Sequence, residues 1–126
     1  MMTSARGGKE SDWLVACLCA AWCGTCRDYR ATLEAMAREH PALHFAWLDI
    51  EDEADALAPF DLDIENFPTL LVARGDDLRF LGTVLPHANT LARTLQAARE
   101  AVLPGMKVER PQALIAAVRA AAETLR

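Results

Sequence analysis

The 126-residue sequence contains no long apolar segment. Its longest apolar run, Trp13–Cys23, is about half as long as a membrane span requires. Residues 1–10 are polar and contain glycine, and they show neither the apolar stretch nor the small-residue cleavage site of a secretory signal. We therefore expect a cytoplasmic protein with no membrane partner and with a flexible lead-in over residues 1–10.

The sequence also lacks clustered positive charge. Its 13 Lys and Arg residues are scattered, and the formal net charge is -5. Because nucleic-acid binding needs a concentrated basic surface, we expect no nucleic-acid partner. Residues 39–73 contain no Lys or Arg, and acidic residues accumulate from position 49 onward. This acidic stretch is either a solvated face or a surface that steers a basic partner, and its members are Asp49, Glu51, Asp52, Glu53, Asp55, Asp61, Asp63 and Glu65.

The four cysteines lie close together in the spacing C-x-C-x3-C-x2-C, at positions 17, 19, 23 and 26. In a cytoplasmic protein such cysteines are more often free thiols, redox groups or metal ligands than structural disulfides. The first two lie in the apolar run Trp13–Ala20, which has no Gly or Pro and is typical of a strand buried on both faces. In a strand, Cys17 and Cys19 point to one side, and Ala16 and Leu18 point to the other.

The rest of the chain predicts alternating helices and strands. Strands are expected at 43–50, 69–73 and 78–84, the last two forming an antiparallel hairpin, and a short helix at 52–60. A helix after Cys26 buries one stripe, namely Tyr29, Leu33, Met36 and Ala37. A later helix begins at the N-cap Asn89 and buries Leu91, Leu95, Ala98 and Val102. The last helix, 111–125, carries its stripe on Leu114, Ile115, Val118, Ala122 and Leu125.

Trp22-Cys23-Gly24-Thr25-Cys26 follows the first strand, and Phe67-Pro68-Thr69 precedes the hairpin. Together with the order of elements, these motifs resemble the thioredoxin family over residues 11–103. The resemblance implies an α/β, thioredoxin-like fold with a central mixed β-sheet flanked by helices. Residues 104–126 then form an appended C-terminal helix, which either packs onto the domain or contributes to a dimer contact.

The resemblance also implies a role for each motif residue. Cys23 becomes the exposed nucleophile and Cys26 the buried resolving thiol of a redox-active centre. Trp22 flanks the pair, and Gly24 and Thr25 form the variable positions between the two cysteines. Phe67, Pro68 and Thr69 form the substrate-binding segment, with Pro68 in the cis conformation. The chemistry is consistent with this arrangement, because an accessible thiolate attacks a disulfide and a thiol one helical turn away releases the mixed disulfide.

The implied function is that of a thiol–disulfide oxidoreductase that reduces protein disulfides and contributes to cell redox homeostasis. It needs no cofactor, and an external reductant such as a reductase or a small thiol resets the pair. Three positions depart from the family pattern. Cys17 stands where thioredoxins have a buried aspartate, Cys19 replaces an aromatic residue, and Trp47 replaces a lysine. These departures predict either a specialised dithiol enzyme or, as the alternative, a binding or adaptor module with little turnover.

Cys17 and Cys19 have three interpretations. They pack as small hydrophobic residues, they form a second disulfide or a regulatory thiol, or they join Cys23 and Cys26 around zinc or an iron–sulfur cluster. We favour packing and expect no metal. His87, in the loop that the resemblance places near the site, is either a proton acceptor or a solvated turn residue.

Overall fold

The computed structural model describes residues 12–20, 22–62, 64 and 66–125, and the expected lead-in over residues 1–10 lies outside them. Its strands are β2 (Trp13–Cys19), β3 (His44–Asp49), β4 (Thr69–Arg74), β5 (Asp77–Thr83) and β6 (Glu123–Thr124). Its helices are α2 (Gly24–Glu39), α3 (Ala54–Leu57), α4 (Ala88–Glu100) and α5 (Pro111–Ala121), and a 3₁₀ turn (Ala58–Phe60) follows α3. Within the described residues, no helix is both long and apolar enough to cross a membrane.

The strands form one five-stranded mixed sheet in the order β5-β4-β2-β3-β6. β2 and β3 are parallel, and every other neighbouring pair is antiparallel, including the predicted hairpin β4–β5. All seven residues of the central strand β2 are buried. Its alternation is the predicted one, because Cys17 and Cys19 belong to one apolar cluster while Ala16 and Leu18 belong to the other.

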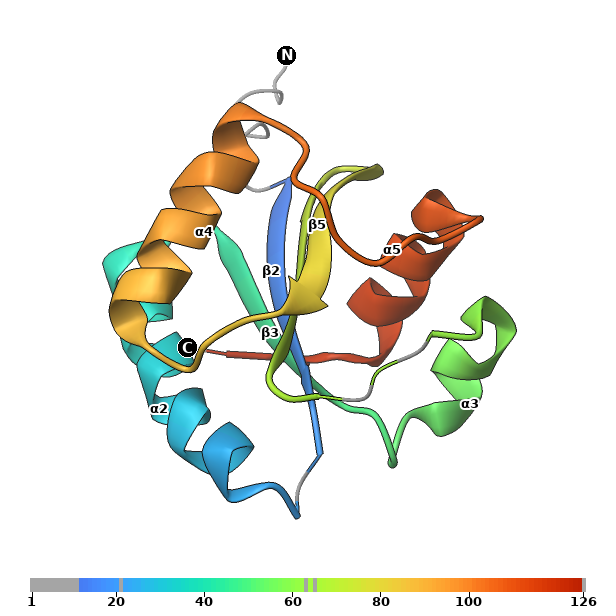
Figure 1. Cartoon of the computed structure of the whole chain (residues 1–126), viewed down its shortest axis with the longest axis horizontal. Coiled ribbons are helices and arrows are strands. Elements are labelled where there is room, and N and C mark those ends of the chain that lie inside the picture. Colours follow the sequence, from blue (N-terminus) through green and yellow to red (C-terminus); the bar gives the residue numbers. More distant parts are fainter. Residues whose placement is uncertain (1–11, 21, 63, 65, 126) are drawn as a thin grey trace.

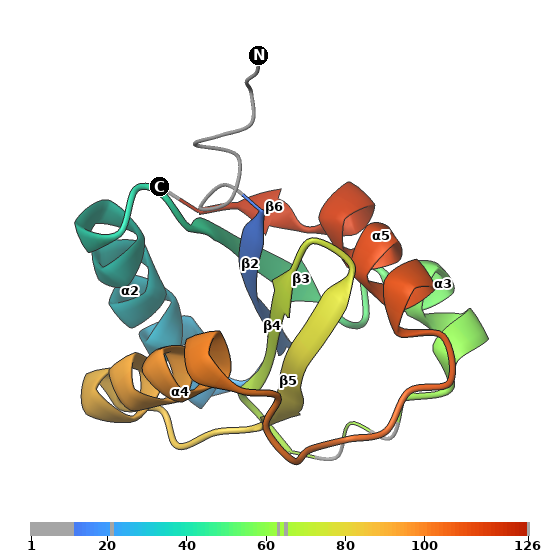
Figure 2. The ribbon, with the colours of Figure 1, turned by 90° about the horizontal axis from the view of Figure 1, so that it is seen from above.

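Helices cover both faces of the sheet (Figures 1 and 2). α2 and α4 pack on the face that carries Cys17 and Cys19, and α3 and α5 pack on the opposite face. The predicted stripe of α2 is confirmed, since Tyr29, Leu33 and Met36 are all buried. The α/β thioredoxin-like architecture expected from the sequence is therefore the observed one.

Helix α4 differs from its prediction at both ends. It begins at Ala88 with His87 as the N-cap residue, two residues before the expected cap Asn89. It ends at Glu100, so Val102, expected in the buried stripe, is 62% exposed. The chain leaves the helix because the next segment runs along β5, where the Leu103 N–H donates to the Arg79 carbonyl oxygen at 2.8 Å.

The C-terminal segment packs onto the domain, which was one of its two interpretations from the sequence. It is not helical to its end. α5 buries Leu114, Ile115 and Val118 and stops at Ala121. The following residues form β6, which pairs antiparallel with the outer edge of β3. Leu125 therefore joins the cluster beneath α2 instead of the stripe of α5. The exposed backbone groups of β3 explain this ending, since they offer hydrogen bonds that a longer helix cannot use.

Gly105 permits a close approach of the chain to β5. The Met106 N–H donates to the Leu81 carbonyl oxygen at 2.7 Å, which draws residues 103–106 against the outer edge of that strand. A Cβ atom at Gly105 would overlap this same carbonyl oxygen. Only glycine fits here without moving backbone.

We predict that Gly105→Ala destabilises the protein by about 1–3 kcal/mol, because backbone must shift to relieve the overlap. Urea unfolding measures the loss. The matched control is Gly24→Ala, where the nearest atom to the new Cβ is an Arg27 guanidinium nitrogen at 3.7 Å. Equal unfolding free energies for the two variants would show that a Cβ atom at Gly105 fits beside the Leu81 carbonyl oxygen, and would contradict the prediction.

Candidate active site

Cys23 lies at the junction between the central strand and helix α2. It is the N-cap residue of α2, in extended backbone conformation, and its N–H donates to the Ala20 carbonyl oxygen at 3.0 Å. It is partly exposed, whereas Cys26, in the first turn of the helix, is completely buried. The unpaired N–H groups and the dipole at a helix N-terminus favour a negatively charged sulfur at this position.

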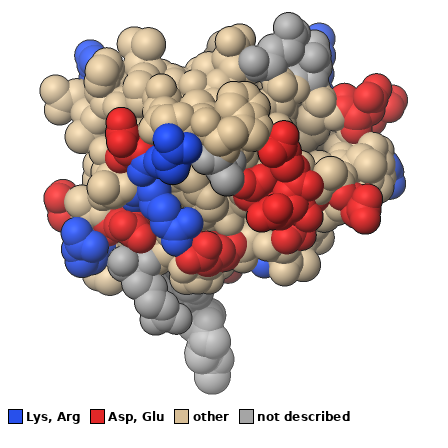
Figure 3. Space-filling view, turned by 90° about the horizontal axis from the view of Figure 1, so that it is seen from below, with Lys and Arg blue, Asp and Glu red and all other residues tan. Residues whose placement is uncertain are grey.

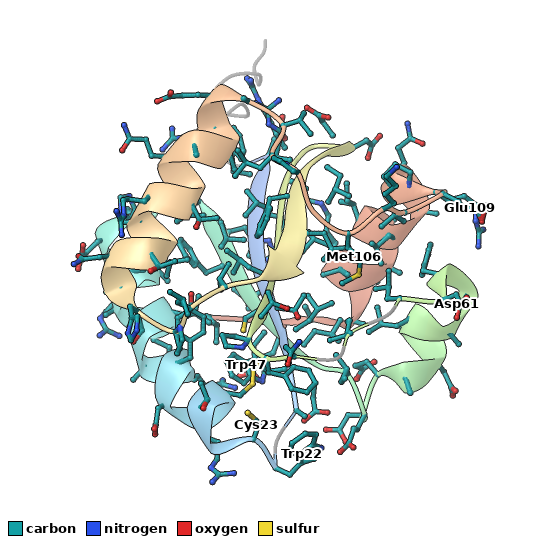
Figure 4. All side chains as sticks on the ribbon, in the orientation of Figure 1. Trp22, Cys23, Trp47, Asp61, Met106 and Glu109 are labelled. Atoms are coloured by element: carbon teal, nitrogen blue, oxygen red, sulfur yellow. A yellow bond between two sulfur atoms is a disulfide. The ribbon has the colours of Figure 1, made fainter. Side chains whose placement is uncertain are left out.

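The two predicted motifs meet at this end of the sheet. Trp22, which is 63% exposed, contacts Phe67 edge to face, with ring centroids 5.7 Å apart and an interplanar angle of 82°. The Phe67–Pro68 peptide bond is cis, as the resemblance implied. Figure 4 shows Trp22 and Cys23 at the same end of the molecule. An exposed aromatic side chain thus stands directly beside the accessible cysteine.

Pro68 and Thr69 are held from inside the domain. The Pro68 carbonyl oxygen accepts a hydrogen bond from the Val84 N–H at 3.1 Å. Thr69 is buried, and its hydroxyl donates to the Asn66 carbonyl oxygen at 2.8 Å. The Thr69 side chain therefore fixes the turn before β4. Gly24 and Thr25, between the two cysteines, are exposed.

A disulfide in the structure joins Cys19 to Cys26, with their Cα atoms 5.8 Å apart, within the ordinary range for such bonds. Cys17 and Cys23 are free thiols. The Cys17 and Cys19 sulfur atoms lie 3.1 Å apart in the core. A second disulfide was one of the three interpretations of Cys17 and Cys19, but the bond uses the resolving cysteine of the predicted pair. Sequence spacing alone did not show that β2 places Cys19 directly against the first turn of α2.

The positions of the family's acid–base helpers face each other across the β2–β3 ladder, where Cys17 pairs with Trp47. Burial raises the pKa of the Cys17 thiol, and the nearby Cys23 raises it further. Cys17 therefore stays protonated and does not replace an aspartate as a proton acceptor. Burial also raises the pKa of Tyr29, with a smaller contribution from Cys17. Among the described residues, the Tyr29 hydroxyl has no hydrogen-bond partner.

Trp47 is held by a long-range arrangement that sequence reasoning missed. The Arg30 guanidinium of α2 lies 5.3 Å from the centroid of the Trp47 ring. Arg30 also pairs with Glu34 at 3.4 Å and with Glu123 of β6. No local pattern reveals this contact, because Arg30 and Glu123 are 93 positions apart. Through Glu123, the C-terminal strand β6 thus holds Arg30 against Trp47, the residue that pairs with Cys17 in the sheet.

Figure 3 shows the end of the molecule where Trp22 and Cys23 lie, with acidic side chains gathered on one side of this face and a patch of Lys and Arg side chains on the other. The exposed residues Glu51, Asp52 and Asp55 follow β3 at this end. Asp63 and Glu65 of the predicted acidic stretch lie outside the described residues. His87 is exposed, at the start of α4. In the part of the chain that the structure describes, no three His, Cys, Asp or Glu side chains are placed to hold a metal ion.

The thioredoxin family model matches residues 7–97. The chain belongs to the thioredoxin family. Members of this family are thiol–disulfide oxidoreductases, and the chain has the fold and the paired cysteines of that class. Among solved structures, it is similar to thioredoxin f of spinach chloroplasts, with 27% identity, a TM-score of 0.60, and coverage of 71% of this chain and 74% of that one. It also shares its fold with Fasciola hepatica thioredoxin, at a TM-score of 0.60 and 24% identity over 69% of this chain and 82% of that one.

Curated relatives include sulfhydryl oxidase 1 of Rattus norvegicus, which is 32% identical over 93 residues. That match covers 71% of this chain but only 12% of the relative's length. Thioredoxin of Echinococcus granulosus is 33% identical over 64 residues, which cover 50% of this chain and 58% of that protein. The likeness to sulfhydryl oxidase 1 is therefore a likeness to a small part of a much longer protein.

We predict that the Tyr29 hydroxyl makes the protein sensitive to alkaline pH. Its raised pKa means that the folded state keeps a proton that the unfolded state loses above the ordinary tyrosine value of 10.0. The unfolding free energy therefore falls as the pH rises above that value, by up to about 1.4 kcal/mol per pH unit for one group.

The test compares urea unfolding of wild type and Tyr29→Phe at neutral pH and at about pH 11. The variant removes a buried hydroxyl without a described partner, so we expect equal or higher stability at neutral pH and a smaller loss at alkaline pH. Cys17→Ala is a parallel test, because it removes a second buried group whose pKa burial raises above the ordinary cysteine value of 9.0, and it should also reduce the alkaline loss. An alkaline loss in Tyr29→Phe as large as in wild type would contradict the prediction.

Proposed function

We propose that this domain reduces disulfides in protein substrates, with Cys23 as the nucleophile and Cys26 as the resolving thiol. The observation that carries the proposal is the exposure of the cysteines. Of the four, only Cys23 is accessible to solvent, and it stands at the N-terminus of α2 one turn before Cys26. A protein disulfide is bulky, so the group that attacks it must lie at the surface.

The reaction is a pair of exchanges. The Cys23 thiolate attacks one sulfur of the substrate disulfide, a Cys23–substrate bond forms, and one substrate thiolate leaves. The Cys26 thiolate then attacks the Cys23 sulfur, the Cys23–substrate bond breaks, and the second substrate sulfur leaves as a thiolate that takes up the proton Cys26 lost. An external reductant, a reductase or a small thiol, returns two electrons to the Cys23–Cys26 disulfide. The form with a Cys19–Cys26 bond enters this cycle only after that bond has opened.

The surroundings of Cys23 support a protein substrate. Trp22 and Phe67 form an apolar contact surface at the site, and Phe67 belongs to the segment that the family uses for an extended substrate. Acidic side chains lie at the same end of the molecule (Figure 3). Such a charge distribution favours the approach of substrates with basic segments and weakens with added salt.

We predict that Cys23→Ser abolishes insulin-disulfide reduction, because no other cysteine is accessible. Cys26→Ser should instead accumulate a mixed disulfide with the substrate, because the resolving thiol is missing. Turbidity measures reduction, and non-reducing electrophoresis detects the adduct. Cys17→Ala is the control, a buried free thiol whose removal should leave turnover intact. Partner association that survives Cys23→Ser without any turnover would support the adaptor alternative instead.

The reducing direction and a cytoplasmic location belong to the same proposal. A cytoplasmic location favours the reducing direction, because glutathione and thioredoxin systems keep thiols reduced in that compartment. Equilibration of the purified protein with glutathione buffers measures the potential of the Cys23–Cys26 pair, and we expect it to lie at or below the cytoplasmic glutathione poise. A more oxidising potential, or recovery of the protein in an extracytoplasmic fraction, would contradict this part of the proposal.

A further inference from the structure

Three of the four sulfur atoms form a continuous group in the core. Cys19 of β2 is bonded to Cys26 of α2, and the Cys17 sulfur lies 3.1 Å from the Cys19 sulfur. A disulfide sulfur carries no hydrogen, so Cys17 is the donor in this contact. The three side chains are completely buried, in the apolar cluster beneath α2.

We propose that Cys19 is a third redox-active residue, a second resolving cysteine that competes with Cys23 for the bond to Cys26. The domain then has two oxidised isomers. One carries the reactive Cys23–Cys26 disulfide at the surface, and the other stores the disulfide as Cys19–Cys26 in the core. This inference rests on the proposed function, because Cys23 and Cys26 must form a disulfide during turnover.

The exposure of each cysteine decides which group can react with the buried Cys19–Cys26 disulfide. Cys19 and Cys26 are each 0% exposed, so neither a substrate nor a reductase can touch the bond between them. Cys23 is partly exposed and free, and it packs against the apolar cluster that contains Cys17, Cys19 and Cys26. Cys23 and Cys26 are three positions apart at the start of a helix, where such residues are neighbours on one face. Cys23 is therefore the route into the buried bond.

The exchange needs no oxidant or reductant. The Cys23 thiolate attacks the Cys26 sulfur, a Cys23–Cys26 bond forms, and the Cys19–Cys26 bond breaks. Cys19 leaves as a thiolate and takes up one proton, which balances the proton that Cys23 lost. In the reverse direction, the Cys19 thiolate attacks Cys26 and Cys23 becomes a free thiol again. One disulfide and two free thiols are present before and after each step.

We assign Cys17 no part in this exchange, although its sulfur lies 3.1 Å from the Cys19 sulfur. Geometry separates the two, because the structure bonds the Cys26 sulfur to Cys19 and leaves Cys17 a free thiol. Cys17 and Cys19 therefore differ in function despite sharing a strand, a face and complete burial. This difference makes Cys17 the matched control for Cys19.

The two isomers behave differently toward partners. In the surface isomer the disulfide is open to a reductant, and the proposed cycle continues. In the stored isomer the disulfide is shielded, and Cys23 acts as a single thiol. A substrate that Cys23 then captures stays attached, because Cys26 is engaged with Cys19. Formation of the Cys19–Cys26 disulfide thus stops the catalytic cycle and leaves the domain covalently bound to its partner.

A disulfide map of oxidised wild-type protein tests the proposal directly. The protein is treated with diamide, quenched in acid, alkylated, and cleaved with chymotrypsin after Leu18, Trp22 and Tyr29. A Cys23–Cys26 bond appears as a loop inside peptide 23–29. A Cys19–Cys26 bond appears as a cross-link between peptides 19–22 and 23–29. We expect both products in one preparation.

Variants then test the exchange. Oxidised Cys19→Ala should give only the internal loop and no Cys23 thiol that iodoacetamide can modify. Oxidised Cys17→Ala should give both products, as wild type does. Cys23→Ser should keep the cross-link and lose its rapid reduction by dithiothreitol in the native protein. The map of wild type needs no substitution, so it remains decisive where a core variant fails to fold.

Failure of this proposal is distinguishable from failure of the proposed function. Only the internal loop in oxidised wild type, together with normal insulin reduction, would overturn the storage role and leave the proposed function standing. Reduction of the cross-link in native Cys23→Ser at the wild-type rate would also overturn it. Absence of the loop together with absence of insulin reduction would overturn both.

Discussion

The burial of β2 on both faces is the constraint on which the rest of the domain depends. All seven of its residues are buried, so every side chain must find an apolar partner on one face or the other. Alternation along the strand divides them, and α2 and α4 cover the half that contains Cys17 and Cys19 while α3 and α5 cover the half that contains Leu14 and Leu18 (Figure 2). Burial of apolar surface is the dominant favourable term in folding, so both faces of β2 contribute to the stability of the domain.

The same constraint organises the redox chemistry. β2 ends beside the first turn of α2, which brings a strand cysteine within bonding distance of the helix cysteine Cys26. One cysteine, Cys23, is therefore accessible at the surface, and the other three are buried in the core. Burial sets the difference in reactivity, because an apolar core disfavours the thiolate whereas the start of a helix favours it. The supporting aspartate and lysine of the family are replaced by Cys17 and Trp47, which leaves packing and sulfur contacts around Cys26.

The C-terminal segment completes this core from a distance. β6 extends the sheet beyond β3, and Leu125 fills space beneath α2. Glu123 holds Arg30 over the ring of Trp47, on the strand next to the cysteines. The edge of β3 is thereby covered, which removes a row of unpaired backbone groups. The segment contributes to the same sheet and core as the site.

Local sequence determined most of the elements and the two faces of β2, because strand and helix periodicities act over a few residues. The meeting of the Trp22–Cys26 motif with Phe67-Pro68 followed only from the resemblance to the thioredoxin family. The same resemblance implied an exposed Cys23 and a buried Cys26, which the structure shows. Tertiary structure alone decided the partner of Cys26, the exit of the chain after Glu100 and the strand at 123–124. Each of these depends on which segments lie side by side after folding. A disulfide requires two Cα atoms a few ångströms apart, and an added strand requires an open edge, so neither is written in the order of residues.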